Sequence, residues 1–121
     1  MNRRELGMLG EKLAREFLAR NGYSIIETNY RCRDGEIDII ALLADTLVFV
    51  EVRTKMSRMF GTPEESITQT KMKRLRAVAA HYCQNRENLP ESQRIDVIAI
   101  QMNRSGIVSH LDLIENAVGE A

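Results

Sequence analysis

Two short and mainly apolar runs, 36–43 and 46–53, each interrupted by a carboxylate, predict two neighbouring antiparallel strands. Only two residues separate the runs, which is the spacing of a tight hairpin, so Leu43 faces Thr46 and the pairing continues outward from there. Because side chains alternate across a strand, we expect one face of this hairpin to be wholly apolar and buried. The residues of that face are Ile37, Ile39, Ala41, Leu43, Val48, Val50 and Val52.

The opposite face of the hairpin carries two acids inside otherwise apolar sequence. Counting outward from the turn places Asp38 directly opposite Glu51, with their Cβ atoms roughly 4.5–5.5 Å apart. Like charges at that separation repel each other unless a cation lies between them, and a divalent metal ion would supply it. A second interpretation stays open on this geometry: Arg53 pairs with Glu36 and neutralises Glu51, which makes a structural ion cluster without chemistry.

A helix is predicted over residues 5–21, where apolar residues recur at helical spacing and Asn21-Gly22 provides a stop. Glu11 shares a neighbouring side of this helix with two small residues, Gly7 and Ala14, which would permit close approach to another element. Glu11 therefore either points inward or is an ordinary solvated carboxylate. The apolar stripe consists of Leu6, Leu9, Leu13 and Phe17.

A second helix is predicted from the sequence Thr62-Pro63-Glu64-Glu65, which has the composition of a capping box, to about residue 84. Lys71 lies within the buried side of this helix by its spacing. Two interpretations are open, because a lysine that points inward either has an acidic partner or extends its ammonium group to water.

The remaining apolar runs predict three more strands. One covers 23–30 and precedes the hairpin, and a short edge strand covers 107–113. A nearly continuous apolar strand over 94–102 should be parallel to strand 46–53, because a helix connects the two. The expected α/β fold is a helix, a three-strand antiparallel meander, a helix, a parallel strand and a short edge strand.

Composition narrows the class of protein. A chain of 121 residues with 44% hydrophobic residues fits one domain covering residues 1–121. Seventeen basic residues balance seventeen acidic ones, which excludes the strong positive field of a nonspecific nucleic-acid coat, so such a contact must use a local patch. The two cysteines are isolated, and no segment has the length of a signal peptide or a membrane span, so we expect a cytoplasmic protein with reduced thiols.

The order of these elements, with Asp38 on the second strand and Glu51-Val52-Arg53 on the third, resembles the core of the restriction-endonuclease-like nucleases, the PD-(D/E)xK superfamily. Several segments are more narrowly similar to the bacterial YraN-like family, whose members have been proposed to be endonucleases and are related to archaeal Holliday-junction resolvases. This resemblance covers nearly the whole chain. The segments are GEKLAREFL, GEIDII, FVEVRTK, the Gly61 to Pro63 turn, the lysine-rich helix and RIDVI.

The resemblance implies a metal-dependent DNA endonuclease that nicks a strand. Asp38 and Glu51 would ligate Mg²⁺, with Mn²⁺ as a substitute, aided by the carbonyl of Val52 and by Glu11 as a further acid. Oxygen ligands suit magnesium. A bound ion would polarise a phosphodiester oxygen and orient a water molecule for attack.

Two positions depart from the superfamily pattern: Arg53 replaces the usual lysine, and Ile37 replaces the proline before the aspartate. Arginine is always protonated, so Arg53 cannot act as a general base, although it can hold a phosphate or stabilise a transition state. Lys55 is the nearest substitute if the strand continues, and Lys71 is the other available amine.

The partner implied by the resemblance is DNA, with branched DNA suggested by the resolvases, and a homodimer would place two sites on opposite strands. Two alternatives remain: a catalytically inactive nuclease fold that binds nucleic acid, motivated by Arg53, and a protein-interaction domain, motivated by the balanced charge. The residues expected to contact DNA are Arg31, Arg33, Lys55, Arg58, Lys71 and Arg74.

Overall fold

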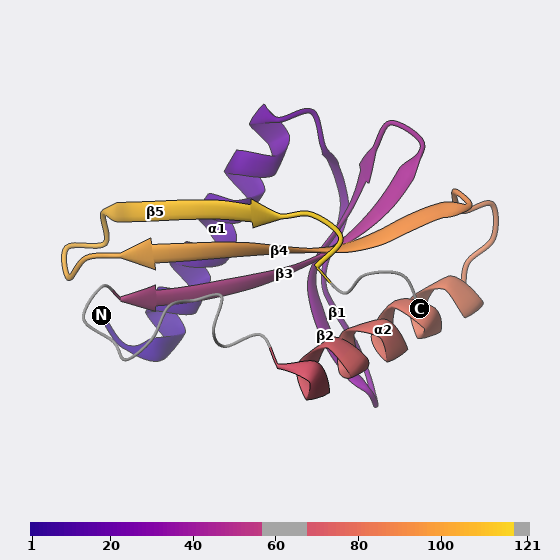
Figure 1. Cartoon of the computed structure of the whole chain (residues 1–121), viewed down its shortest axis with the longest axis horizontal. Helices are drawn as coiled ribbons and strands as arrows, with labels where there is room; N and C mark the ends of the chain where they lie inside the picture. Colours follow the sequence, from indigo (N-terminus) through magenta and orange to yellow (C-terminus); the bar gives the residue numbers. More distant parts are fainter. Residues whose placement is uncertain (57–67, 118–121) are drawn as a thin grey trace.

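The computed structural model describes residues 1–56 and 68–117, which form one five-stranded sheet with a helix on each face (Figure 1). The strands lie in the order of the sequence, and all neighbours are antiparallel except β3 and β4. The expected α/β fold is confirmed, although the predicted helix start at Thr62 lies outside the described residues. The elements are α1 (Arg3–Arg20), β1 (Ser24–Cys32), β2 (Gly35–Leu43), β3 (Thr46–Met56), α2 (Gln69–Gln84), β4 (Ser92–Met102) and β5 (Val108–Ile114).

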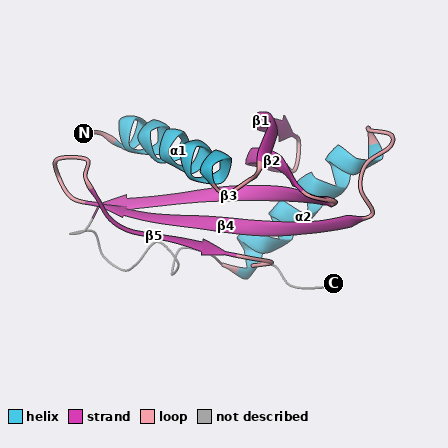
Figure 2. Cartoon of the chain, turned by 90° about the horizontal axis from the view of Figure 1, so that it is seen from above, coloured by secondary structure: helices cyan, strands magenta, loops and turns pink. Residues whose placement is uncertain are grey.

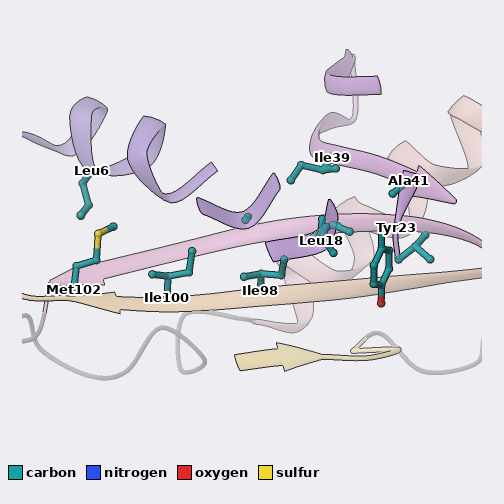
Figure 3. Close-up of a cluster of buried hydrophobic side chains, with 11 residues drawn as sticks. Leu6, Leu18, Tyr23, Ile39, Ala41, Ile98, Ile100 and Met102 are labelled. Atoms are coloured by element: carbon teal, nitrogen blue, oxygen red, sulfur yellow. The ribbon is translucent and has the colours of Figure 1, made fainter. Parts of the chain in front are cut away.

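Two hydrophobic cores join the helices to opposite faces of the sheet (Figure 2). On one face, α1 packs on the middle strands, and Figure 3 shows Leu6 of this helix above Met102 of β4 and Leu18 closer to Ile98. Burying one such side chain fully stabilises the fold by roughly 1.5–3 kcal/mol. The core under α2 contains Ile37, Ile40, Leu47, Phe49, Leu75, Val78, Ala79, Tyr82 and Ile95.

The β2–β3 hairpin has the predicted register. Leu43 pairs with Thr46, and the ladder continues without a shift to Ile39 opposite Val50. Ala44 in the turn has a φ of 50°, as the tight two-residue connection requires. The register predicted from the loop length is therefore confirmed over this ladder, and it ends immediately before the two acids.

The predicted face of the hairpin is wrong at Ile37, which packs in the core under α2, whereas Ile39 packs in the core under α1. The alternation breaks at Asp38, between them. On the neighbouring strand Thr28 pairs with Ile39, but Asn29 has a left-handed φ of 53°. A left-handed residue increases the local twist of a strand pair, and Figure 2 shows β1 and β2 turned away from the plane of β3 to β5.

Helix α1 is rotated relative to its predicted stripe. Ala14 and Leu18 are fully buried, whereas Leu9 is only partly buried. The close approach expected at Gly7 occurs at Gly10, where a Cβ atom would lie 2.0 Å from Oγ1 of Thr54 on β3; a Cβ atom at Gly7 would meet nothing within 4 Å. The helix therefore contacts β3 through its backbone at Gly10.

Capping residues set the ends of α1. The side chain of Asn2 accepts a hydrogen bond from the backbone N–H of Glu5 at 2.8 Å. At the other end Gly22 has a φ of 87°, and the N–H of Tyr23 donates to the carbonyl of Leu18 at 3.0 Å, which is a Schellman arrangement. No helix among residues 1–56 and 68–117 combines the length and apolar character needed to cross a membrane.

We predict opposite effects for alanine at the two glycines of α1. Gly10→Ala should destabilise the protein by about 1–3 kcal/mol, because the new methyl group collides with Thr54. Gly7→Ala should stabilise it by roughly 0.5–1 kcal/mol, because alanine favours helix and the site is open. Urea unfolding measures the free energy of unfolding of both variants. Equal changes in the two variants would contradict the packing of α1 on β3 at Gly10.

Candidate functional site

Asp38 lies at the centre of a polar cluster, where the β2–β3 ladder ends. Its Oδ2 accepts a hydrogen bond from the backbone N–H of Val52 at 2.7 Å, and its carboxyl group shares a further hydrogen bond with that of Glu51. Glu51 is itself buried, with 5% of its surface exposed. The two acids therefore meet as the loop spacing predicted.

Burial, the hydrogen bond to Glu51 and the negative charge of Glu51 together raise the pKa of Asp38 to about 9. The N–H of Val52 opposes this rise, and the charge of Glu11 adds to it. Asp38 consequently holds a proton at neutral pH when no cation is bound. An acid that is shielded from water next to a second acid is either neutral or paired with a positive group. In this site the positive group lies nearer to Glu51 than to Asp38.

Lys71 of α2 supplies that charge. Its Nζ lies 2.8 Å from Oε2 of Glu51, while the nearest nitrogen of Arg53 lies 4.0 Å from the same oxygen. The first interpretation of Lys71, that it has an acidic partner, is confirmed. The alternative interpretation paired Arg53 with Glu36 and with Glu51; in the structure Glu36 pairs with Arg31 at 3.2 Å, and Arg53 lies 4.0 Å from Glu51. The twist at Asp38 explains this difference, since the β2–β3 ladder does not continue to Glu36.

On the other side of Asp38, three acids could hold a cation. Glu11, Glu36 and Asp38 each offer one carboxylate oxygen, and these oxygens lie within 4.8 Å of one another. The side-chain N–H₂ of Asn29 donates to Glu11 and to Glu36, at 3.0 Å each. Glu11 therefore points inward, which resolves the choice left open for it. The left-handed conformation of Asn29 is what carries its amide to both acids.

Two hollows open on opposite sides of Asp38. The larger, about 800 Å³, lies beside α1, and the smaller, about 280 Å³, lies beside α2. Glu36, Asp38, Val52 and Arg53 line both hollows. The larger is also lined by Arg3, Arg4, Leu6, Gly7, Met8, Glu11, Asn29, Arg31, Thr54 and Lys55, and the smaller by Gly35, Glu51, Lys71, Arg74, Leu75 and Val78.

The structure brings most of the predicted basic residues to these hollows, but not all. Arg31 and Lys55 line the larger hollow, and the expected extension of β3 as far as Lys55 is confirmed. Arg74 lines the smaller one together with Lys71. Arg33 is exposed in the β1–β2 turn and lines neither, and Arg58 lies outside the described residues.

Sequence reasoning missed four residues of this site. Glu36 was considered only as the partner of Arg53 in the structural alternative, although its position two residues before Asp38 could have indicated a ligand. Asn29 carried no usable signal, because its role depends on a left-handed backbone inside a strand. Arg3 and Arg4 were far from the motifs in sequence, and only the packing of α1 brings them near.

The profile of the family described as "Uncharacterised protein family UPF0102" matches residues 10–100. This chain belongs to the UPF0102 family. A UPF0102 protein of Caldicellulosiruptor saccharolyticus is 46% identical over 117 residues, which cover 97% of this chain and 99% of that protein. A UPF0102 protein of Moorella thermoacetica is 45% identical over 117 residues, which cover 97% of this chain and 98% of that protein. A UPF0102 protein of Dehalococcoides mccartyi is 44% identical over 119 residues, which cover 98% of this chain and 97% of that protein.

The part of the chain that matches the UPF0102 profile contains the four acids of the site and Lys71. Family membership, expected from the motifs, is thereby confirmed. The name of the family states no activity, so the reaction stays a prediction, as do the metal and the partner.

The raised pKa of Asp38 predicts how the stability of this UPF0102 protein depends on pH. The folded state retains a proton that the unfolded chain releases near pH 4. The contribution of Asp38 to the free energy of unfolding is therefore fully present below that pH and is lost as pH rises toward about 9. Asp38→Asn keeps a neutral side chain at all pH values. Its stability relative to the parent should therefore increase from pH 5 to 9, by up to about 1.4 kcal/mol per pH unit.

Urea unfolding in EDTA at several pH values measures this difference. Glu16→Gln on the exposed side of α1 is the control, and its stability relative to the parent should change little with pH. Parallel stability curves for Asp38→Asn and the parent would refute the assignment of the buried proton to Asp38.

Proposed function

We propose that this protein is a metal-dependent endodeoxyribonuclease that hydrolyses a phosphodiester bond at Asp38. The observation that supports this most strongly is the convergence of four acids between two hollows that also carry basic residues. Acids that bind a divalent ion, flanked by cations that bind phosphates, are the two requirements for hydrolysing a nucleic-acid backbone.

The donor set fits Mg²⁺ or Mn²⁺, because the side chains offered are carboxylates and these ions prefer oxygen ligands. Glu11, Glu36 and Asp38 would hold the ion, and Glu51 would complete the site from the adjoining strand. When bound, the ion supplies polarisation of a phosphoryl oxygen and activation of water. Of the predicted ligands, Val52 supports Asp38 through its N–H, and its carbonyl remains a proposed ligand.

The basic residues would bind the phosphates and stabilise the negative charge that develops in the reaction. Arg53 lines both hollows, so its planar fork is suited to hold the phosphate that is cleaved. Lys71 holds Glu51 in place, and its ammonium group can stabilise negative charge on the leaving oxygen. This assignment gives Lys71 the part that the superfamily pattern gives to the lysine two residues after the glutamate. Lys55 lies on the rim of the larger hollow and would bind a neighbouring phosphate.

The proposed substrate is DNA, and branched DNA and a homodimer follow from the resemblance to the resolvases alone. A second candidate function is a binding module without catalysis, which the arginine at position 53 favours. The two functions differ in their need for a metal ion. A binding module would show salt-dependent DNA affinity without binding Mg²⁺.

Cleavage assays test the proposed reaction. With Mg²⁺ or Mn²⁺, the parent should nick labelled junction, flap or duplex DNA, and Asp38→Asn and Glu51→Gln should each lower the rate at least about 100-fold, or about 2.7 kcal/mol in the barrier. Glu11→Gln should slow the reaction, whereas Glu16→Gln on the same helix should not. Equal rates in the parent, Asp38→Asn and Glu51→Gln would mean that the activity comes from a contaminant.

Calorimetry with Mn²⁺ alone tests the proposed metal site. A proton must leave Asp38 before its oxygens ligate the ion, so the apparent affinity should rise as pH approaches about 9, by up to roughly tenfold per pH unit. Buffers with different ionisation enthalpies should report about one proton released per ion. Glu36→Gln should weaken binding at least about tenfold if the three-acid set holds the ion. Binding that ignores both pH and this substitution would rule out these ligands.

A further inference from the structure

Two arginines that the motifs did not indicate lie on the rim of the larger hollow. Arg3 and Arg4 are exposed residues in the first turn of α1, and both line the hollow together with Glu11. Within residues 1–56 and 68–117, neither forms an ion pair, whereas Arg31 on the opposite rim is paired with Glu36. The charges of Arg3 and Arg4 are therefore available to a ligand.

The stability of α1 gives no reason for arginine at these two positions. They directly follow the N-cap residue Asn2, at the end where the helix dipole is positive. A cation there is unfavourable for the helix, whereas an acid would be favourable. Residues that are exposed, unfavourable for their own helix and without an acidic partner in the described part of the chain indicate a role in binding.

One face of α1 connects these arginines to the acids. Arg3, Gly7 and Glu11 follow one another at intervals of four residues, so they lie along the same side of the helix, and all three line the hollow. Arg3 and Glu11 are eight positions apart, which corresponds to about 12 Å along the helix axis. The arginines therefore stand more than one nucleotide away from the carboxylates, since a DNA strand advances about 3.4 Å per nucleotide.

Gly7 leaves this face clear. A glycine inside a helix is less stable than an alanine, yet a Cβ atom at position 7 would contact nothing within 4 Å. Packing therefore does not require glycine at position 7. At position 10 it does, because a side chain there would collide with Thr54. A missing side chain between Arg3 and Glu11 keeps open the passage from one to the other.

We propose that Arg3 and Arg4 bind backbone phosphates of the strand whose cleaved phosphate lies at Asp38, and that this strand runs along the Gly7 face of α1. The inference rests on the proposed nuclease function and names the path of its substrate. The strand passes over the acids, where Arg53 is shared by both hollows, and continues to Lys71 and Arg74 beside α2. Helix α1 thus supplies both an acid and the phosphate-binding arginines on one side of the cut.

The test compares two double variants of α1 with the same loss of charge. Arg3→Gln with Arg4→Gln removes the proposed phosphate ligands, and Arg15→Gln with Arg20→Gln removes two arginines that line neither hollow. A third variant, Gly7→Leu, leaves the charges and blocks the passage. Circular dichroism and Mn²⁺ affinity check that the fold and the acids are intact in each.

For the first double variant we expect KM for DNA to rise at least about tenfold with kcat nearly unchanged. The slope of log affinity against log salt should become shallower by about 0.7–0.9 for each phosphate that the protein no longer neutralises, or roughly 1.5–2 in all. Gly7→Leu should raise KM without changing that slope by as much, and the Arg15 and Arg20 control should match the parent in both quantities.

The outcomes separate this inference from the function on which it rests. If the parent cleaves DNA and the Arg3 and Arg4 variant has the same KM and salt slope as the parent, the strand path is wrong and the nuclease remains. Equal effects in both double variants would also refute the path, because they would reflect net charge only. If the parent neither binds nor cleaves DNA with Mn²⁺ present, the proposed function itself fails.

Discussion

The contact between the carboxyl groups of Asp38 and Glu51 is the constraint on which the rest of the site depends. A half-buried acid and a buried acid within hydrogen-bonding distance of each other are unfavourable in the doubly charged state unless a cation joins them. The sheet brings them together because the β2–β3 ladder runs up to Ile39 and Val50 and then ends. Without a metal ion the site holds a proton on Asp38, and the metal site proposed above would have to displace that proton, which would link pH to metal binding.

Elements from both faces of the sheet serve this contact. Helix α2 places Lys71 against Glu51, and α1 places Glu11 beside Asp38, with Asn29 joining Glu11 to Glu36. Asp96, which is fully buried, shows how a structural carboxylate differs from those of the candidate site. It receives hydrogen bonds from Arg94 and from the N–H of Asn116, so its charge is satisfied without any ion.

Loop length and helical spacing predicted the structure correctly at several places where the geometry depends on residues close together in the chain. The two-residue loop determined the hairpin register, and helical spacing placed Lys71 on the buried side of its helix, although only the structure shows that its partner is Glu51. Strand alternation failed at Ile37, where a left-handed Asn29 on another strand changes the twist, because it assumes a regular backbone.

The rotation of α1 about its axis was also ambiguous in the sequence. For this reason Gly7, rather than Gly10, was expected to lie close to another element, which the structure shows to be β3. Both glycines adjoin the apolar side of one amphipathic helix, and the hydrophobic pattern fixes the rotation of such a helix only to within about one residue, since adjacent residues differ by about 100°. The contact with Thr54 decides between them. The four acids show the same limit, because Asp38 and Glu51 follow from pairing, whereas the approach of Glu36 to Glu11 depends on that helix position. Position 53 illustrates how the site can depart from the superfamily pattern: Lys71 already lies 2.8 Å from Glu51, so the proposed mechanism needs no second amine on β3, and it assigns the phosphate to Arg53, which lines both hollows.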